Sequence, residues 1–139
     1  MIIIDTNVIS EVLKPRPSDA VVRWLTAQEP TAVFTTAVTK AEVLYGVESL
    51  PRGKRQAQLS AAIESMLVEE YEGRILSFDE YAAREYARIV AEREVAGRPI
   101  SQFDAMIAAI TRLHDAVLAT RNLADFDRCG IDLINPWDG

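Results

Sequence analysis

Short apolar runs alternate with longer amphipathic segments along the chain. Ile2-Ile3-Ile4 is a continuous β-branched run, which is typical of a strand buried on both faces. Further short strands are predicted at 32–35, 74–77, 116–119 and 131–134. Apolar spacing and the positions of proline and glycine predict helices at 7–13, 18–28, 39–50, about 52–71 and 79–96, and a last helical repeat at 103–113. Strands that alternate with helices predict an α/β fold whose mostly parallel sheet is covered on both sides.

The helical patterns also predict buried faces. In the segment 18–28 the buried face is expected to consist of Val21, Val22, Trp24 and Leu25. Phe103, Met106, Ile107, Ile110 and Leu113 repeat at helical spacing in the last helix. Because that helix is almost entirely apolar, we expect it to be buried.

Composition limits the chemistry that the chain can perform. Its 139 residues are 49% hydrophobic and 26% charged, without internal repeats or a long linker, so we predict one globular domain over 1–139. The single histidine, His114, and the single cysteine, Cys129, exclude an internal disulfide, a paired-histidine mechanism and a zinc site with several nitrogen or sulfur ligands. Both are interpreted as structural, which leaves oxygen atoms as the ligands for any metal.

Hydropathy and charge bear on location and partners. No apolar run approaches the roughly 20 residues that cross a bilayer, and the apolar start meets Asp5 too early for a signal-peptide core, so a cytoplasmic protein without a membrane segment is expected. The net charge of −6 argues against a broad basic surface for nucleic acids. A local basic patch or a basic protein partner remains compatible with it.

Three acidic residues lie where elements of the predicted fold begin or end. Asp5 ends the most apolar strand, so its side chain is expected at the carboxyl edge of the sheet, where α/β proteins bind ligands. Each acid also has a structural interpretation. Asp5 could be a helix N-cap, and Glu42 and Asp104 could be the N3 residues of the capping-box patterns 39–42 and 101–104. For Asp104 the apolar surroundings weigh against that interpretation, because a buried carboxylate needs partners.

Convergence of these acids would favour a metal site. Two like charges 4 Å apart repel by roughly 4 kcal/mol at an effective dielectric near 20, and a cation removes that penalty. Carboxylate and water ligands suit Mg²⁺ or Mn²⁺. Asn122, after the fourth predicted strand, is a neutral oxygen donor, and Asp125 is either a fourth acid or part of a polar surface turn. Arg121 is the best-placed candidate for a phosphate contact, whereas Arg52, Lys54 and Arg55 either guide a nucleic-acid backbone or begin a solvated helix.

An ordered set of motifs covers nearly the whole chain and resembles the PIN-domain nucleases, especially the VapC and FitB-like toxin ribonucleases of toxin–antitoxin pairs. The motifs are Ile2-Ile3-Ile4-Asp5-Thr6-Asn7, Thr39-Lys40-Ala41-Glu42 with Tyr45-Gly46-Val47, Phe103-Asp104-Ala105-Met106-Ile107-Ala108, Thr120-Arg121-Asn122 with Asp125-Phe126, and Asn135-Pro136-Trp137. The resemblance implies a compact α/β/α sandwich whose clustered acids bind Mg²⁺ or Mn²⁺ and that cleaves single-stranded or looped RNA.

The resemblance also implies roles for individual residues. Asp5, Glu42 and Asp104 match the three family acids, and Thr6 matches a hydroxyl residue that supports the site. Asn122 stands at a fourth position where many relatives have Asp, which bears on whether a second metal binds. Such toxins are held by a cognate antitoxin and are usually dimeric, so a homodimer and a toxin–antitoxin complex are expected. Apolar surface on the long helices 52–71 and 79–96 that exceeds the needs of the core is a candidate for either interface.

Two other functions fit parts of the pattern. A phosphoacceptor signalling domain also gathers acids around Mg²⁺, but it needs an acidic pair after the first strand and a distal lysine. Here Thr6 and Asn7 follow the first acid and no lysine follows Lys54. A PIN-like domain with a degenerate site that only binds a partner is favoured by Asn122 and disfavoured by the intact acids.

Overall fold

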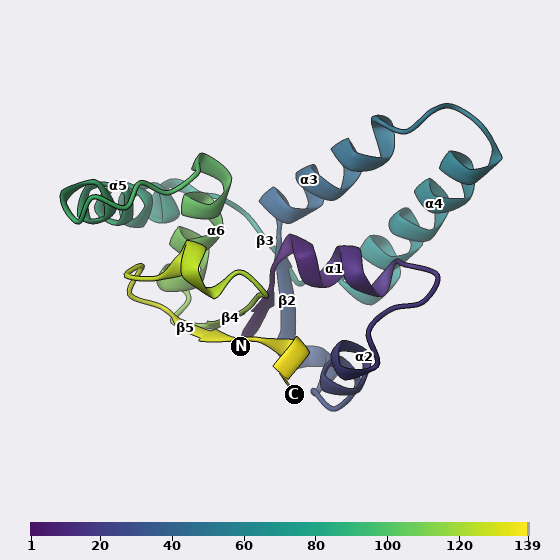
Figure 1. The fold of residues 1–139 in the computed structure, drawn as a ribbon, viewed down its shortest axis with the longest axis horizontal. Helices are drawn as coiled ribbons and strands as arrows, with labels where there is room; N and C mark the ends of the chain where they lie inside the picture. Colours follow the sequence, from purple (N-terminus) through teal and green to yellow (C-terminus); the bar gives the residue numbers. More distant parts are fainter. Residues whose placement is uncertain (139) are drawn as a thin grey trace.

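The structure, a computed structural model, describes residues 1–138. Its centre is one five-stranded sheet in the order β3-β2-β1-β4-β5, in which every neighbouring pair of strands is parallel (Figure 1). The strands are β1 (Ile2–Ile4), β2 (Val33–Thr36), β3 (Ile75–Leu76), β4 (Val117–Ala119) and β5 (Asp132–Ile134). All five predicted strands are therefore confirmed, the last three in shorter forms.

Within residues 1–138 six α-helices connect the strands, and all but the fourth were expected within two residues of their observed bounds. They are α1 (Thr6–Val12), α2 (Asp19–Thr26), α3 (Ala37–Glu48), α4 (Lys54–Ser65), α5 (Glu80–Val95) and α6 (Gln102–Leu113). The predicted helix over 52–71 changes its geometry partway: α4 ends at Ser65 and the π-helical turn η2 (Met66–Glu70) continues it. Short 3₁₀ turns are η1 (Pro30–Ala32), η3 (Leu123–Phe126) and η4 (Pro136–Asp138).

The two faces of the sheet carry separate apolar layers. Ile3 packs into the layer formed with α5 and α6, whereas Ile4 packs into the layer formed with α1, α2, α3 and α4. This alternation follows from the two-residue repeat of a strand, whose successive side chains point to opposite faces. Figure 1 shows the same division, with α5 and α6 on one side of the strands and α1 and α2 on the other. The predicted three-layer α/β/α sandwich is thus confirmed. The expected domain extends to Gly139, which lies outside the described residues.

Two apolar side chains expected in the core are instead exposed. Val22 is 37% exposed, because the buried face of α2 is centred on Val21 and the next helical position is turned by about 100°. Phe103 is 50% exposed and lies in the first turn of α6, before the buried part of the helix begins at Ala105. Of the other residues predicted to be buried in α6, Ile107 and Ile110 are buried, and Met106 and Leu113 are partly buried.

The connectivity determines where a ligand can approach. β1 is the central strand, and the chain leaves it towards β2 and β3 before it returns to its other side at β4. In such sheets ligands bind outside the carboxyl ends of the strands at the point where the strand order reverses. That point lies between Asp5 and Thr120, the residues that follow β1 and β4. Among residues 1–138, none of the helices has the length and apolarity to cross a membrane.

Candidate active site

Asp5 lies at the carboxyl end of β1, as expected, and is only 5% exposed. Its backbone N–H donates to the Ala119 carbonyl oxygen at 3.0 Å, which ties it to the end of β4. Its Oδ1 accepts from the Thr6 N–H at 2.7 Å, and its Oδ2 accepts from Thr120 Oγ1 at 2.9 Å and Asn7 Nδ2 at 3.3 Å. The carboxylate thus caps α1 and also belongs to a polar network that joins two strand ends.

Glu42 is on the second turn of α3, and the capping-box interpretation of Thr39–Glu42 is wrong. The N-cap of α3 is Thr36, whose Oγ1 accepts from the Thr39 N–H at 3.0 Å, so the helix begins three residues earlier than that pattern requires. The side chain of Glu42 therefore has no role in capping the helix. Its Oε1 accepts from Thr6 Oγ1 at 2.8 Å, and the same hydroxyl lies 3.1 Å from Thr39 Oγ1.

Asp104 is in the first turn of α6. Ser101 is the N-cap, since its Oγ accepts from the Asp104 N–H at 3.2 Å, so this half of the expected capping pattern is present. The carboxylate was expected to be buried, but Asp104 is half-buried because it faces a cavity. α6 precedes β4 and runs against it, which brings its first turn to the carboxyl edge of the sheet.

One cavity of about 390 Å³ brings these segments together at the carboxyl edge. It is lined by the three candidate acids Asp5, Glu42 and Asp104, by the predicted substrate contacts Thr6 and Arg121, by Asn122, and by Asn7, Ser10, Glu11, Lys14 and Trp137. All six predicted site residues therefore line the same cavity. Of residues 1–138, Asp125 is not one of those that form its wall.

Burial and like charges disfavour the ionised form of each acid. Burial raises the pKa of Asp5 to about 6, opposed by the hydrogen bonds from Thr120 and Thr6 and reinforced by the charges of Asp104 and Glu42. Burial likewise raises the pKa of Glu42, which the Thr6 hydrogen bond lowers and the Asp104 charge raises. For Asp104, burial is the first cause of the raised pKa, Ser101 lowers it, and Asp125 raises it through charge. The three acids interact electrostatically and so form one site.

The donor set fits a hard divalent cation that keeps some of its water. Carboxylate, hydroxyl and amide oxygens are ligands that Mg²⁺ and Mn²⁺ accept, and a cation would offset the repulsion that raises the three pKa values. Among residues 1–138 there is no group of three or more His, Cys, Asp or Glu side chains close enough to surround one ion. Mg²⁺ does not need such a cage, since it is usually bound through one or two carboxylates with waters completing its shell.

Asn7 and Thr120 belong to the sequence motifs but were assigned no role there. Their side chains connect the segments that follow β1 and β4. Asn7 Nδ2 donates to Thr120 Oγ1 at 3.1 Å, and its Oδ1 accepts from the Arg121 N–H at 3.3 Å. Thr120 Oγ1 also accepts from the Asn122 N–H at 3.1 Å. The register pairs Ile4 with Ala119, so Asp5 and Thr120 are the next residues on adjacent strands. If the strands 2–4 and 116–119 are placed next to each other in the sheet, the sequence predicts that Asp5 and Thr120 are neighbours.

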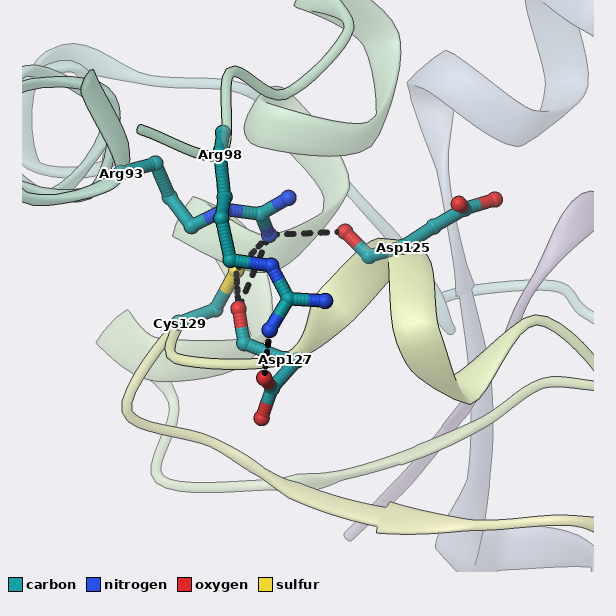
Figure 2. Close-up of polar contacts among 5 residues, drawn as sticks. All are labelled: Arg93, Arg98, Asp125, Asp127 and Cys129. Carbon is teal, nitrogen blue, oxygen red and sulfur yellow. Dashed lines mark hydrogen bonds and ion pairs between the residues drawn. The ribbon is translucent and has the colours of Figure 1, made fainter. Parts of the chain in front are cut away.

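Arg93 fixes the turn after η3 from within the protein and was also missed. It is 4% exposed, and its Nη1 donates to the main-chain oxygens of Asp125 and Asp127, both at 2.9 Å (Figure 2). Its Nε donates to the Arg98 oxygen at 2.6 Å, and Cys129 Sγ lies 3.5 Å from Nη1. Arg98 in turn pairs with the Asp127 carboxylate at 2.9 Å. Cys129 is buried beside this cation, as a structural cysteine would be.

A family model described as "PIN domain" matches residues 2–131. Among curated proteins, the chain is 38% identical to VapC ribonuclease Y4jK of Sinorhizobium fredii and 39% identical to toxin FitB of Neisseria gonorrhoeae. Each alignment covers 99% of both proteins.

Solved structures give the same result at the level of the fold. The crystal structure of FitAcB from Neisseria gonorrhoeae matches with a TM-score of 0.93 at 39% identity, over 99% of each chain. VapBC-5 from Mycobacterium tuberculosis, described as a member of the VapBC family of toxin–antitoxin systems, matches with a TM-score of 0.70 at 29% identity over 96% of each chain. The chain belongs to the PIN-domain family, in the group that includes the VapC ribonucleases and the FitB toxin.

Proposed function

We propose that this protein is a toxin of a toxin–antitoxin pair, an endoribonuclease that hydrolyses RNA phosphodiester bonds with the help of Mg²⁺ or Mn²⁺. One observation carries the proposal: Asp5, Glu42 and Asp104, from three distant segments, line one cavity at the carboxyl edge of the sheet. The names of the VapC relatives, which are ribonucleases, support the choice of RNA as the substrate.

Asp5 and Asp104 are the proposed direct ligands of the cation, and Glu42 is a third ligand or the group that orients the attacking water. When bound, the cation supplies Lewis-acid polarisation of the phosphodiester and lowers the pKa of water for in-line attack. Thr6 holds Glu42 in place through its hydroxyl. Asn122 is neutral, so it adds no charge to the site and acts through a hydrogen bond or a water.

The first test is cleavage of single-stranded RNA by Asp104→Asn, which keeps the size of the side chain and removes its charge. We expect the rate to fall roughly a hundredfold or more, because the metal contributes several kcal/mol to such reactions. Asp132→Asn, on exposed β5, is the matched control and should cleave at the wild-type rate.

The second measurement follows the thermal midpoint in the presence of Mn²⁺. A cation that binds only the native state raises the midpoint, so wild type and Asp132→Asn should gain several degrees and Asp104→Asn little or nothing. Undiminished cleavage in EDTA, or an equal Mn²⁺ response in both variants, would contradict the proposed chemistry.

The proposed antitoxin has a candidate binding site beside the acids. A groove of about 520 Å³ between α1, α3 and α4 shares Thr6 and Glu42 with the acid-lined cavity, and its apolar wall consists of Leu13, Val43, Val47, Leu59 and Ile63. An amphipathic segment that lies in this groove can extend a basic side chain into the acidic cavity. VapBC-5, described as a toxin–antitoxin system, supports such a partner. The net charge of −6 favours a basic one.

The proposal includes further features that depend on the substrate and the family. Arg121 is proposed to contact an RNA phosphate. Arg52, Lys54 and Arg55 are exposed at the start of α4, and Arg55 also lines the groove, so this basic cluster is proposed to meet RNA or antitoxin rather than the core. A homodimer is proposed from the family. An RNA substrate also implies a cytoplasmic site of action.

A further inference from the structure

The acid-lined cavity must admit an anion, although its chemistry depends on carboxylates. An RNA phosphate that enters it needs a cationic partner from the protein as well as a metal. Two cationic side chains, Lys14 and Arg121, line the cavity. Lys14 Nζ is paired with Glu11 Oε1 at 2.9 Å, which neutralises its charge. Within residues 1–138 Arg121 forms no ion pair, so its guanidinium is the cation that remains available for a phosphate.

Arg121 is held in an unusual way for an exposed side chain. Its backbone N–H donates to Asn7 Oδ1 at 3.3 Å, which fixes its main chain beside Asp5. Its guanidinium carbon lies 5.0 Å from the centre of the Trp137 ring. A cation over an aromatic face is attracted by the ring quadrupole. Among residues 1–138 the Arg121 guanidinium donates no hydrogen bond, so its N–H groups are available for the two-pronged hydrogen bonding that suits phosphate oxygens.

Trp137 itself is anchored on the rest of the protein. It is part of η4, its backbone N–H donates to Asn135 Oδ1 at 2.9 Å, and its half-buried side chain packs against the apolar layer on the α1 and α2 face of the sheet. A fixed ring restricts the conformations of the arginine above it before any ligand arrives. This reduces the entropy that the side chain loses when it binds.

We infer that Trp137 is a positioning residue that holds Arg121 at the wall of the active-site cavity, where the arginine binds a phosphate of single-stranded RNA. The inference deepens the proposed function and depends on it for the identity of the substrate. It does not depend on cleavage, because the contact is made in the bound state with or without hydrolysis.

The test is equilibrium binding of a fluorescein-labelled, mixed-sequence single-stranded RNA in EDTA, measured by anisotropy over a range of salt concentrations. Arg121→Gln should raise Kd about tenfold at low salt. It should also lower the slope of log K against log salt by about 0.7, the value for one phosphate contact on a single strand. Arg84→Gln, at an exposed position on α5, removes the same charge away from the cavity and should change neither quantity.

The role of Trp137 is tested by a double-mutant cycle. Trp137→Leu should raise Kd about two- to fivefold in the wild-type background and should have no further effect in Arg121→Gln, because the ring acts through the arginine. Trp137→Phe keeps an aromatic face and should restore most of the affinity.

Three results would overturn the inference: an unchanged salt slope in Arg121→Gln, an equal effect of Trp137→Leu in both backgrounds, or no rescue by Trp137→Phe. If Trp137→Leu caused a general loss of structure, it would weaken binding equally in the wild-type and Arg121→Gln backgrounds. Trp137→Phe, which keeps the aromatic ring, would then test the contact by itself. If the protein bound RNA as described but did not cleave it with Mg²⁺, the proposed nuclease function would fail and this contact would stand.

Discussion

At the scale of single residues, Asp5 is subject to two opposing effects in the absence of a cation: hydrogen bonds favour its ionised form, and burial disfavours it. Its carboxylate is held by three donors, from Thr6, Asn7 and Thr120, which favour the charged form. Burial and two neighbouring acids oppose that form more strongly, and together they raise the pKa of Asp5 to about 6. The protein therefore keeps a group whose ionisation costs stability, as expected of a residue retained for chemistry rather than for folding.

This conflict predicts a dependence of stability on pH. The folded-state pKa of about 6 exceeds the ordinary aspartate pKa of 3.8, so well below pH 3.8 the carboxyl is protonated in both states and contributes nothing. As the pH rises from 3.8 to 6 the unfolded state ionises first, and the free energy of unfolding falls by about 3 kcal/mol. The variant Asp5→Asn cannot ionise. In EDTA, its free energy of unfolding relative to wild type should therefore increase by about 2 kcal/mol between pH 4 and pH 7.5, whatever constant offset the amide introduces.

Urea unfolding at the two pH values measures this difference. Excess Mn²⁺ should reduce it, because a bound cation favours the ionised Asp5 in wild type. A pH-independent difference between the two proteins would show that burial does not control the ionisation of Asp5.

At the scale of secondary-structure elements, the sequence predicted the position of each strand and helix better than the details of its ends. Apolar runs and helical spacing located the five strands and six helices because these patterns follow from burial, which the fold satisfies throughout. The start of α3 was misjudged, since Thr36 and Thr39 are both suitable N-caps and only the end of β2 decides between them. The exposure of Phe103 was missed because the spacing of apolar residues does not show where along α6 the buried part of the helix begins.

The candidate site was predictable to the same extent. Asp5, Glu42 and Asp104 could be selected because acids at element boundaries are visible in the sequence. The hydrogen bond from Thr120 to Asp5, 115 positions apart in the sequence, and the contact of Arg121 with Trp137 depend on which strands and turns become neighbours. The role of Arg93 could not be predicted for a further reason. Its partners are main-chain oxygens, which every residue has, so the sequence does not indicate which of them it binds.

The Arg93 contacts predict that one side chain fastens the turn 125–129 to α5. Arg93→Met should lower the free energy of unfolding by about 2–4 kcal/mol, since it leaves several main-chain oxygens without their charged donor. Arg93→Lys should recover only part of this loss. It keeps the positive charge, but an ammonium group cannot reach the oxygens of Asp125, Asp127 and Arg98 in the fork geometry of a guanidinium. The exposed position on the same helix, Arg84→Met, should change stability by no more than about 0.5 kcal/mol. Equal losses at positions 84 and 93, measured by urea unfolding, would contradict this role.

At the scale of the whole molecule, the sheet and α3 contribute to both apolar clusters: Val38 of α3 lies in the cluster with α5 and α6, and Val43 of α3 lies in the other cluster. Ile89 lies in the cluster with α5 and α6, and Ile63 lies in the cluster with α1 to α4, and each is at most 1% exposed. The strands between them are only two to four residues long, as in β3 and β2, so neither cluster has a sheet of its own. We therefore expect the two layers to unfold together as one domain.

This expectation can be tested with one conservative truncation in each layer. Ile63→Val and Ile89→Val each remove a buried methylene, so each should lower the free energy of unfolding by about 0.5–1.5 kcal/mol. If the protein is one cooperative unit, each variant shifts a single urea transition without changing its slope, and near-UV and far-UV signals coincide. The double variant should then show the sum of the two losses within about 0.5 kcal/mol, because the residues are on opposite faces of the sheet. Two separate transitions, one sensitive to position 63 and the other to position 89, would instead mean that the helices on each face fold as independent units, and that the acids in the cavity depend on two stabilities rather than one.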